Sequence, residues 1–295
     1  MSRLSVPGAF VFLAVVWGLS FPAIAIGLEY LPPLLFAALR YDVAAVLLLV
    51  YAVFATNDWR PTQEDAIALV GGGVFLVAGN GLLFVGQQTV PSGVAAIMQA
   101  LGPIVTALWA LVLLEERLSA LGAAGVAVGF LGIGFVVQPT PENLLSGDTI
   151  GRLLILVQVV SVALGGVLIQ RSSPTVGRAA FTGWSMLLGA AVLHMGSLVA
   201  RETPTASAFE PIAIGAVVYL GVFSTAIAFF MYFTVLEQRG AFEASLVTYL
   251  VPIVATVAGV FVLGEQIGVL TFIGFALVFA GFALLKRRAL GTLLV

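Results

Sequence analysis

The sequence predicts an all-α integral membrane protein in which ten transmembrane helices form two inverted five-helix repeats. Hydrophobic residues make up 61% of the 295 residues and charged residues only 9%, against about 45–50% and about 25% in soluble domains. The apolar residues form long runs without the alternation of barrel strands. A Pro-Ile-Val motif at Pro103 recurs at Pro252, in the second half of the chain.

Ten runs are long enough, or nearly so, for the roughly 20 apolar residues with which a helix crosses about 30 Å of hydrocarbon. The connections between them are short and hold much of the proline and acidic residues, so no soluble domain fits between the runs. In chain order we expect helices at Pro7 to Leu28, Pro33 to Phe54, Ala66 to Gly86, Ser92 to Leu114, Leu121 to Val137, Ile150 to Gln170, Gly177 to Ala200, Ile212 to Leu236, Ala244 to Leu263 and Val269 to Leu285.

The first run also has features of a secretory signal peptide, because Arg3 precedes it and the small-x-small triplet Ala23-Ile24-Ala25 lies near its end. We interpret it as an uncleaved first helix, since cleavage would remove one member of the repeat described below.

The positions of lysine and arginine predict the orientation, because cytoplasmic segments carry an excess of these residues. With ten helices and an inside N-terminus, nine of the 12 basic residues lie on the inner side and two on the outer side. We therefore expect a multi-pass protein of the cell (plasma) membrane with both termini in the cytoplasm. The inner residues are Arg3, Arg60, Arg117, Arg171, Arg178, Arg239, Lys286, Arg287 and Arg288, and the outer ones are Arg152 and Arg201.

The two halves of the chain repeat each other at an offset of 149 positions, which carries Pro103 onto Pro252 and Glu116 onto Glu265. Five helices separate the copies, and an odd number inverts the second copy in the membrane. Inverted repeats are typical of secondary transporters. We expect a first repeat at residues 1–138, a linker at 139–149 and a second repeat at 150–288.

Each proline is expected to bend its helix, because it removes a hydrogen bond to the carbonyl four residues earlier. Those residues are Gln99 and Thr248, which are equivalent in the repeat. Both would lie near mid-membrane depth, where transporters of this plan bind substrate. The alternative is that Pro103 and Pro252 only shape the packing between helices.

At these residues the chain resembles the EamA family of the drug/metabolite transporter superfamily. YLVPIVATVAGVFVLGEQI, TAIAFFMYFTVLEQRGAFEAS, AVVWGLSFPAIAIG and LLFAALRYDVAAVLLL carry the resemblance, which extends over the whole chain, and Glu115 stands where the family usually has glycine. The resemblance implies ten helices, cytoplasmic termini and movement of small organic solutes such as amino acids, usually outward.

Arg40 and Asp42 are the clear cases of charged residues inside an expected membrane-spanning helix, where charge is expensive. They lie about 200° apart around the helix and cannot simply pair with each other. Arg40 could contact an anion and Asp42 a proton or cation, or both could pair with other helices. His194, the only histidine, is either a proton relay or an interhelical hydrogen-bonding group.

Further polar and aromatic residues within the helices suggest a central pocket. Gln99 and Thr248 stand out because both the repeat and the proline select them, and Trp17 lies midway along its helix, where an interface anchor is not expected. The alternative for these residues is helix packing. The expected substrate-binding residues are Trp17, Asn80, Gln99, Gln158, Tyr232, Thr248 and Tyr249.

These observations favour a secondary transporter, an exporter of small metabolites that works by alternating access. No P-loop pattern is present, and a membrane enzyme would need clustered catalytic groups that the sequence lacks; a non-transporting sensor or assembly subunit is a further alternative. With no cysteine and a net charge of −2, we expect no cofactor, no metal and no nucleic-acid partner. The expected partners are a small-molecule substrate and the lipid bilayer. A glycine face at Gly122, Gly125, Gly129 and Gly132 serves close helix packing or, alternatively, a homodimer.

Overall fold

The computed structural model describes residues 6–56, 58–115, 119–138 and 145–285, and for 6–7, 233–234 and 236–246 it describes the backbone alone. Within this part the regular structure is entirely helical. Two short 3₁₀ turns, η1 (Gln63–Asp65) and η3 (Ala206–Phe209), precede the third and eighth apolar segments. The helices are α1 (Val6–Leu28), α2 (Pro33–Ala55), α3 (Ala66–Val70), η2 (Gly71–Ala78), α4 (Gly81–Gly86), α5 (Ser92–Gln99), α6 (Gly102–Leu113), α7 (Ala120–Val137), α8 (Gly147–Ser172), α9 (Arg178–Val199), α10 (Pro211–Val218), η4 (Tyr219–Ile227), α11 (Ala228–Leu263) and α12 (Val269–Leu285).

Eight helical segments of the described chain are long and apolar enough to cross a membrane, and two shorter apolar helices follow at Val247–Leu263 and Val269–Leu285. Their limits lie within a few residues of the expected ones. The prediction of an all-helical integral membrane protein is confirmed, whereas ten membrane crossings in two inverted repeats stay a prediction.

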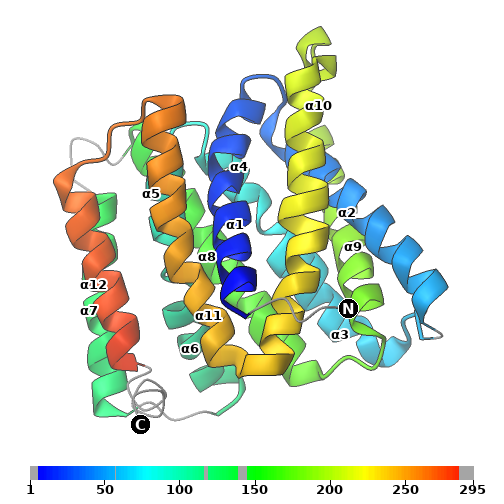
Figure 1. Ribbon diagram of the computed structural model, residues 1–295, viewed down its shortest axis with the longest axis horizontal. Helices are drawn as coiled ribbons and strands as arrows, with labels where there is room; N and C mark the ends of the chain where they lie inside the picture. Colours follow the sequence, from blue (N-terminus) through cyan, green and yellow to red (C-terminus); the bar gives the residue numbers. More distant parts are fainter. Residues whose placement is uncertain (1–5, 57, 116–118, 139–144, 286–295) are drawn as a thin grey trace.

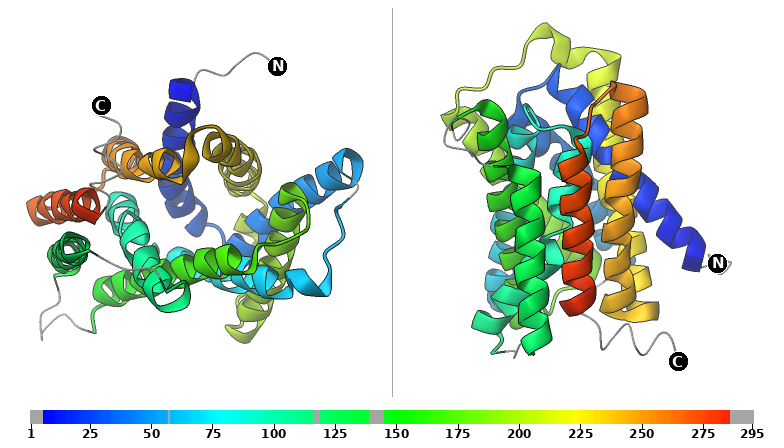
Figure 2. Two further views of the ribbon diagram at one scale, coloured as in Figure 1. Left: turned by 90° about the horizontal axis from the view of Figure 1, so that it is seen from below. Right: turned by 90° about the vertical axis from the view of Figure 1, so that its left-hand side faces the viewer.

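The helices form an elongated bundle (Figures 1 and 2). α7 and α12 lie side by side at one edge, α2 packs against α9 toward the other edge, and α1 lies between them in contact with α11. Figure 1 shows that α11 reverses direction at the lower end of the bundle, so that its second arm runs back upward beside α1. The expected helices at Ile212 to Leu236 and Ala244 to Leu263 are thus joined through helical backbone.

Two segments, η2 and η4, are π-helical. They are equivalent in the repeat, because the 149-residue offset carries residues 71–78 onto 220–227. π-Helical turns are rare and frequent at functional sites. Both segments pack against helices that carry the polar residues described below, η2 against α8 and α9, and η4 against α2.

Glycines allow α7 and α12 to approach backbone to backbone. A Cβ atom added at Gly125 would lie 2.5 Å from the carbonyl oxygen of Gly281, and one at Gly132 would lie 2.6 Å from that of Gly274. No side chain fits at such distances. This part of the expected glycine face is therefore used for packing within the chain, and a homodimer formed through it stays a prediction.

Asp65 joins the start of α3 to the segment before α9. Its buried carboxylate accepts hydrogen bonds from the backbone N–H groups of Thr62 at 2.8 Å, Thr175 at 2.7 Å and Val176 at 3.4 Å. An ionised carboxylate forms stronger hydrogen bonds than a neutral group. Asp65 thus holds together two segments that are more than a hundred residues apart in the sequence.

Two glutamates cap distant helices in a similar way. Glu202 accepts hydrogen bonds from the backbone N–H groups of Leu34 and Leu35, at 3.1 and 2.9 Å, in the first turn of α2. Glu265 accepts hydrogen bonds from the first N–H groups of α5, the closer of them at 2.8 Å. A carboxylate at this end of a helix satisfies unpaired N–H groups and interacts favourably with the helix dipole. Glu116, the repeat equivalent of Glu265, lies outside the described residues.

Glu115 has a positive φ of 55°, and Gly264, its equivalent in the repeat, has a φ of 67°. Gly264 is the C-cap of α11, and Glu115 follows the end of α6 by two residues. Left-handed conformations suit glycine and are unfavourable for residues with a Cβ atom. Glu115 therefore keeps a positive φ at a position where the family resemblance predicts glycine.

We expect Asp65→Ala to lower the free energy of unfolding by about 3 kcal/mol, because it leaves buried backbone N–H groups without a charged acceptor. Thermal or denaturant unfolding of the purified protein in detergent measures the change. Glu64→Ala, at the exposed neighbouring position, is the control and should change stability by less than about 0.5 kcal/mol. Equal effects of the two substitutions would contradict the role of Asp65.

Glu115→Gly should stabilise the protein by about 1 kcal/mol, because it relieves the left-handed conformation. The reciprocal change, Gly264→Ala, should destabilise it by a similar amount, since a Cβ atom there meets nothing within 4 Å and only the backbone conformation opposes it. The midpoints of thermal unfolding in detergent test both changes. The explanation is wrong if both substitutions shift the midpoint in the same direction.

Candidate functional site

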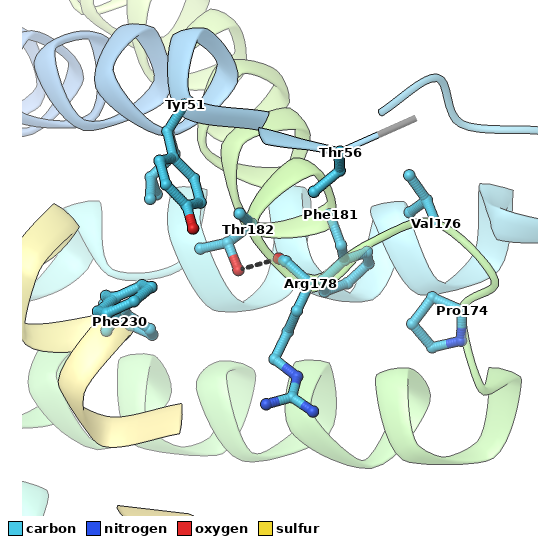
Figure 3. A pocket seen from close by; sticks show the side chains of 11 residues that line it. Tyr51, Thr56, Pro174, Val176, Arg178, Phe181, Thr182 and Phe230 are labelled. Atoms are coloured by element: carbon cyan, nitrogen blue, oxygen red, sulfur yellow. Dashed lines mark hydrogen bonds between the residues drawn. The ribbon is translucent and has the colours of Figure 1, made fainter. Parts of the chain in front are cut away.

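A cavity of about 600 Å³ lies at one end of the bundle, between the C-terminal part of α2, the segment before α9 and the start of α11 (Figure 3). We call it the outer cavity because it lies at the end of the bundle; the name does not refer to a side of the membrane. Aromatic and apolar side chains dominate its lining, and the exposed Arg178 is its charged residue. The lining residues are Leu48, Tyr51, Thr56, Pro174, Val176, Arg178, Ala179, Phe181, Thr182, Phe229 and Phe230.

A smaller inner cavity of about 60 Å³ adjoins the outer one, because Phe181, Thr182 and Phe229 line both. Its polar groups include Tyr41 and Ser185. The Ser185 hydroxyl is fully buried and has no hydrogen-bond partner among the described residues. A buried hydroxyl without a partner is costly, so a solute that hydrogen-bonds to Ser185 would gain from its position.

The two cavities lead from the end of the bundle toward its middle. Tyr51 lines the outer cavity and Tyr41 the inner one, and their separation of ten positions on α2 corresponds to about 15 Å along the helix. This is about half the thickness of a bilayer's hydrocarbon core.

Tyr41 is also the end of a chain of hydrogen-bonded polar side chains. Asn80 Nδ2 donates to the Tyr41 hydroxyl at 2.6 Å, Gln158 Nε2 donates to Asn80 Oδ1 at 3.0 Å, and Gln99 Nε2 donates to Gln158 Oε1 at 2.9 Å. We call these four residues the polar chain. Its members come from α2, the turn between η2 and α4, α5 and α8, so one network connects four segments.

Every amide in the polar chain donates in the same direction, toward Tyr41. The Tyr41 hydroxyl accepts from Asn80 and keeps its own hydrogen for donation, while the side chain itself lines the inner cavity. Aligned hydrogen bonds of this kind polarise one another. The polar chain therefore ends at a residue that lines the inner cavity.

Local breaks in the helices bring these polar groups into the bundle. Asn80 lies between the end of η2 and the start of α4, and Gln99 is the last residue of α5, just before the chain turns into α6 at Gly102. Pro103 occupies the first turn of α6, where its missing N–H is tolerated. The helix that contains Pro103 is thus interrupted there. Pro252, in contrast, lies inside α11, whose helical backbone continues through it.

A second polar group surrounds Arg40, which is 7% exposed. Its Nε donates to Thr225 Oγ1 at 2.8 Å, and that hydroxyl donates to the Leu220 carbonyl oxygen at 2.7 Å. The guanidinium carbon lies 5.1 Å from the centre of the Tyr41 ring and 5.9 Å from that of Phe84. Such distances suit cation–π interactions.

Trp17 lies next to this second group. Its Nε1 donates to the Ser224 carbonyl oxygen at 3.1 Å, and its ring contacts those of Phe229 and Tyr232, with centroids 6.1 and 5.4 Å away. Phe229 lines both cavities. Two of the expected binding residues, Trp17 and Tyr232, therefore form an aromatic cluster beside the path.

Asp42 and His194 form a pair between α2 and α9, with His194 Nε2 2.7 Å from Asp42 Oδ2. Both side chains are part exposed, at 37% and 39%. Asp42 therefore pairs with a side chain of another helix. The sequence analysis gave such pairing as the alternative to a proton or cation site. The sequence did not indicate this partner.

The remaining expected residues lie apart from the polar chain. Thr248 is half-buried, and the Tyr249 ring packs against Phe279 and Phe282 of α12, with centroids 5.4 and 4.4 Å away. The structure thus brings Asn80, Gln99 and Gln158 together and places Tyr249 among aromatic residues. A role of Thr248 and Tyr249 in binding stays a prediction.

Sequence reasoning missed Tyr41, Ser185 and Arg178. The repeat selects none of them. Tyr41 could have been noticed as a polar side chain next to Arg40, within the same apolar run. Ser185 is one of many small polar residues in the helices, and its significance depends on the cavity that it lines.

Comparison with known proteins identifies relatives over almost the whole chain. The sequence profile described as the EamA-like transporter family matches residues 7–138 and 149–287. The "uncharacterized inner membrane transporter YedA" of Escherichia coli K12 is 32% identical over 88% of this chain and 83% of its own length. An "uncharacterized transporter" of Archaeoglobus fulgidus is 27% identical over 92% of this chain and 95% of its own length. A solved crystal structure aligns with a TM-score of 0.67 over 98% of this chain and 99% of that one, at 20% identity, which shows that the two share a fold.

We expect Gln158→Leu to reduce stability by about 1–3 kcal/mol, because it removes two interhelical hydrogen bonds, each worth about 0.6–1.7 kcal/mol in a membrane. Unfolding of the protein in detergent measures this loss. Gln170→Leu is the matched control, since Gln170 lies on the same helix and is exposed. A Gln158→Leu variant as stable as the control would show that the polar chain contributes nothing to the fold.

Proposed function

Because the chain belongs to the EamA-like transporter family, we propose that it is a secondary transporter that exports small organic metabolites such as amino acids by alternating access. The family and the multiple apolar helices establish a multi-pass membrane protein related to transporters. The direction, the substrate class and the mechanism belong to the proposal.

The observation that carries the proposal is the path through the two cavities to Tyr41. A solute entering the outer cavity meets an aromatic lining and, about 15 Å further along α2, the inner cavity, which Tyr41 and Ser185 line. Concave, largely apolar sites with a few converging polar groups are typical of small-molecule binding. The polar chain holds Tyr41 in place through Asn80.

The proposal includes ten membrane spans in two inverted repeats, at residues 1–138 and 150–288 with a linker at 139–149. Three observations support it. The family profile matches two separate segments, the π-helical segments η2 and η4 occupy equivalent positions, and the glycine contacts between α7 and α12 are reciprocal. Gly125 meets Gly281 and Gly132 meets Gly274, as two copies related by a local twofold axis would.

The proposed orientation places both termini in the cytoplasm, on the evidence of the basic residues. The segments before η1 and before α9 would then lie on the cytoplasmic side, together with the outer cavity that the second of them lines. In this orientation the described conformation is accessible from the cytoplasm. A cytoplasmic entrance agrees with uptake of a solute for export.

Alternating access requires the opposite end to be closed in this conformation, and Glu202 supports such a closure. It links the segment after α9 to the first turn of α2 through two hydrogen bonds. In the proposed cycle these bonds break when the site opens to the outside. Rocking of one repeat against the other around a central site is the general scheme for transporters built from inverted repeats.

Uptake of a labelled panel of amino acids and other metabolites into proteoliposomes, with and without a pH gradient, tests the proposal. We expect at least one solute to move, and expect Gln99→Leu, Thr248→Val and Ser185→Leu each to reduce its rate at least tenfold. Ser185→Leu fills the inner cavity, and Gln99→Leu removes the far end of the polar chain. Gln88→Leu, at an exposed position, should retain the rate.

The transport proposal fails if no solute moves under any gradient. If transport persists in Ser185→Leu, the inner cavity does not lie on the transport path. Comparison of the two pH conditions also separates proton-coupled transport from facilitated diffusion or exchange.

A further inference from the structure

Arg40 is a buried cation that the described protein does not neutralise. It lies in α2, within a membrane-spanning segment, and is 7% exposed. No carboxylate among the described residues forms an ion pair with it. A charge in such surroundings is rare and points to a function unless another charge compensates it.

Among the side chains that the structure describes, the groups that contact Arg40 are neutral. Thr225 accepts one hydrogen bond from Nε, and the rings of Tyr41 and Phe84 contact the guanidinium. A guanidinium has five N–H donors, so most of its hydrogen-bonding capacity is directed elsewhere than to the described side chains. These contacts orient the group without supplying the negative charge that it lacks.

Four carboxylates of the described residues already have other partners. Asp42, two residues away, lies 2.7 Å from His194. Asp65, Glu202 and Glu265 accept hydrogen bonds from backbone N–H groups of other segments. Each acid therefore has a partner of its own, and a rearrangement that transferred one of them to Arg40 would leave that partner unsatisfied.

Arg40 lies beside the path through the cavities. The Arg40 guanidinium carbon lies 5.1 Å from the centre of the Tyr41 ring, and Tyr41 lines the inner cavity. Thr225 and Ser224 are neighbours in η4, and the Ser224 carbonyl binds Trp17, whose ring contacts the cavity-lining Phe229. A solute that reaches Tyr41 thus comes close to both the cation and the aromatic cluster.

We propose that Arg40 binds the carboxylate of the transported solute. The proposal rests on the proposed transport function and names its substrate class: organic acids or zwitterionic amino acids with an apolar body that fits the aromatic lining. The planar guanidinium can form two parallel hydrogen bonds to a carboxylate. Arg40 then determines specificity, because a solute without the carboxylate leaves the buried cation uncompensated.

Binding to the full-length protein in detergent tests this assignment with four probes that share a phenyl ring. Phenylalanine and phenylacetate carry a carboxylate, whereas phenylacetamide and phenethylamine do not. Calorimetry or stabilisation against heat should show binding of the carboxylates at least tenfold tighter than that of the amide and the amine. Inorganic phosphate, as a competitor, should displace them poorly if the site is built for a carboxylate and not for a phosphate or a phospholipid headgroup.

Arg40→Gln should weaken carboxylate binding at least tenfold and abolish the preference over the amide. Arg171→Gln, which removes an exposed arginine at the end of α8, should leave both unchanged. If Arg40→Gln does not fold, Arg40→Lys carries the test, and its carboxylate binding should be at least threefold weaker because an ammonium cannot form the paired bonds. Equal binding of carboxylate and amide, or unchanged preference in the Arg40 variant, overturns the proposal.

The same probes in proteoliposomes separate this inference from the transport function. Arg40-dependent binding of carboxylates without flux would support the site and contradict transport. Flux of the amide and the carboxylate at equal rates would support transport and overturn the role of Arg40. Absence of both carboxylate binding and flux would refute the two proposals together.

Discussion

The hydrocarbon interior of a membrane offers no water to hydrogen-bond exposed polar groups, and this constraint explains the main features of the structure. Regular helices satisfy most of the backbone internally. Where helices begin close to another segment, as α2 and α5 do, a carboxylate from a distant part of the chain caps them. Where the regular helix is interrupted, near Asn80 and Gln99, side chains form a network with one another. Irregular backbone and polar side chains therefore occur together, and they mark the candidate site.

Much of the fold could be predicted because the same constraint acts on the sequence. An apolar run of the required length has few alternatives to a helix in a membrane, so helix limits such as Pro33–Ala55 agree with expectation to within a residue or two. Local structure also follows the 149-residue offset, although the sequence analysis did not predict this: Glu115 has a positive φ, as its counterpart Gly264 does. The repeat did not predict that the helix would break at Pro103 and continue through Pro252, because surrounding helices decide how the lost hydrogen bond is accommodated.

The candidate site could be predicted only in part. Asn80, Gln99 and Gln158 were expected as polar residues within helices. Which of them hydrogen-bond to one another, and how the network reaches Tyr41, depends on how the helices cross. The partner of Asp42 is His194, 152 residues away, and no periodicity connects them. The cavities depend on side chains from several helices. Pairings between distant helices and the shape of empty space are properties of the assembled bundle, and a single sequence carries no direct record of them.

Three consecutive residues of α2 connect this helix to three different parts of the bundle. Successive residues on a helix point about 100° apart, and Arg40, Tyr41 and Asp42 accordingly contact three different elements: Thr225 in η4, Asn80 after η2, and His194 in α9. Under the proposed division into repeats, the first and third partners belong to the second half and Asn80 to the first. α2 is therefore bonded to both halves at the same depth. A motion of one half against the other must break or exchange at least one of these bonds. An anion that binds to the Arg40 cation can therefore change which of these bonds is favoured.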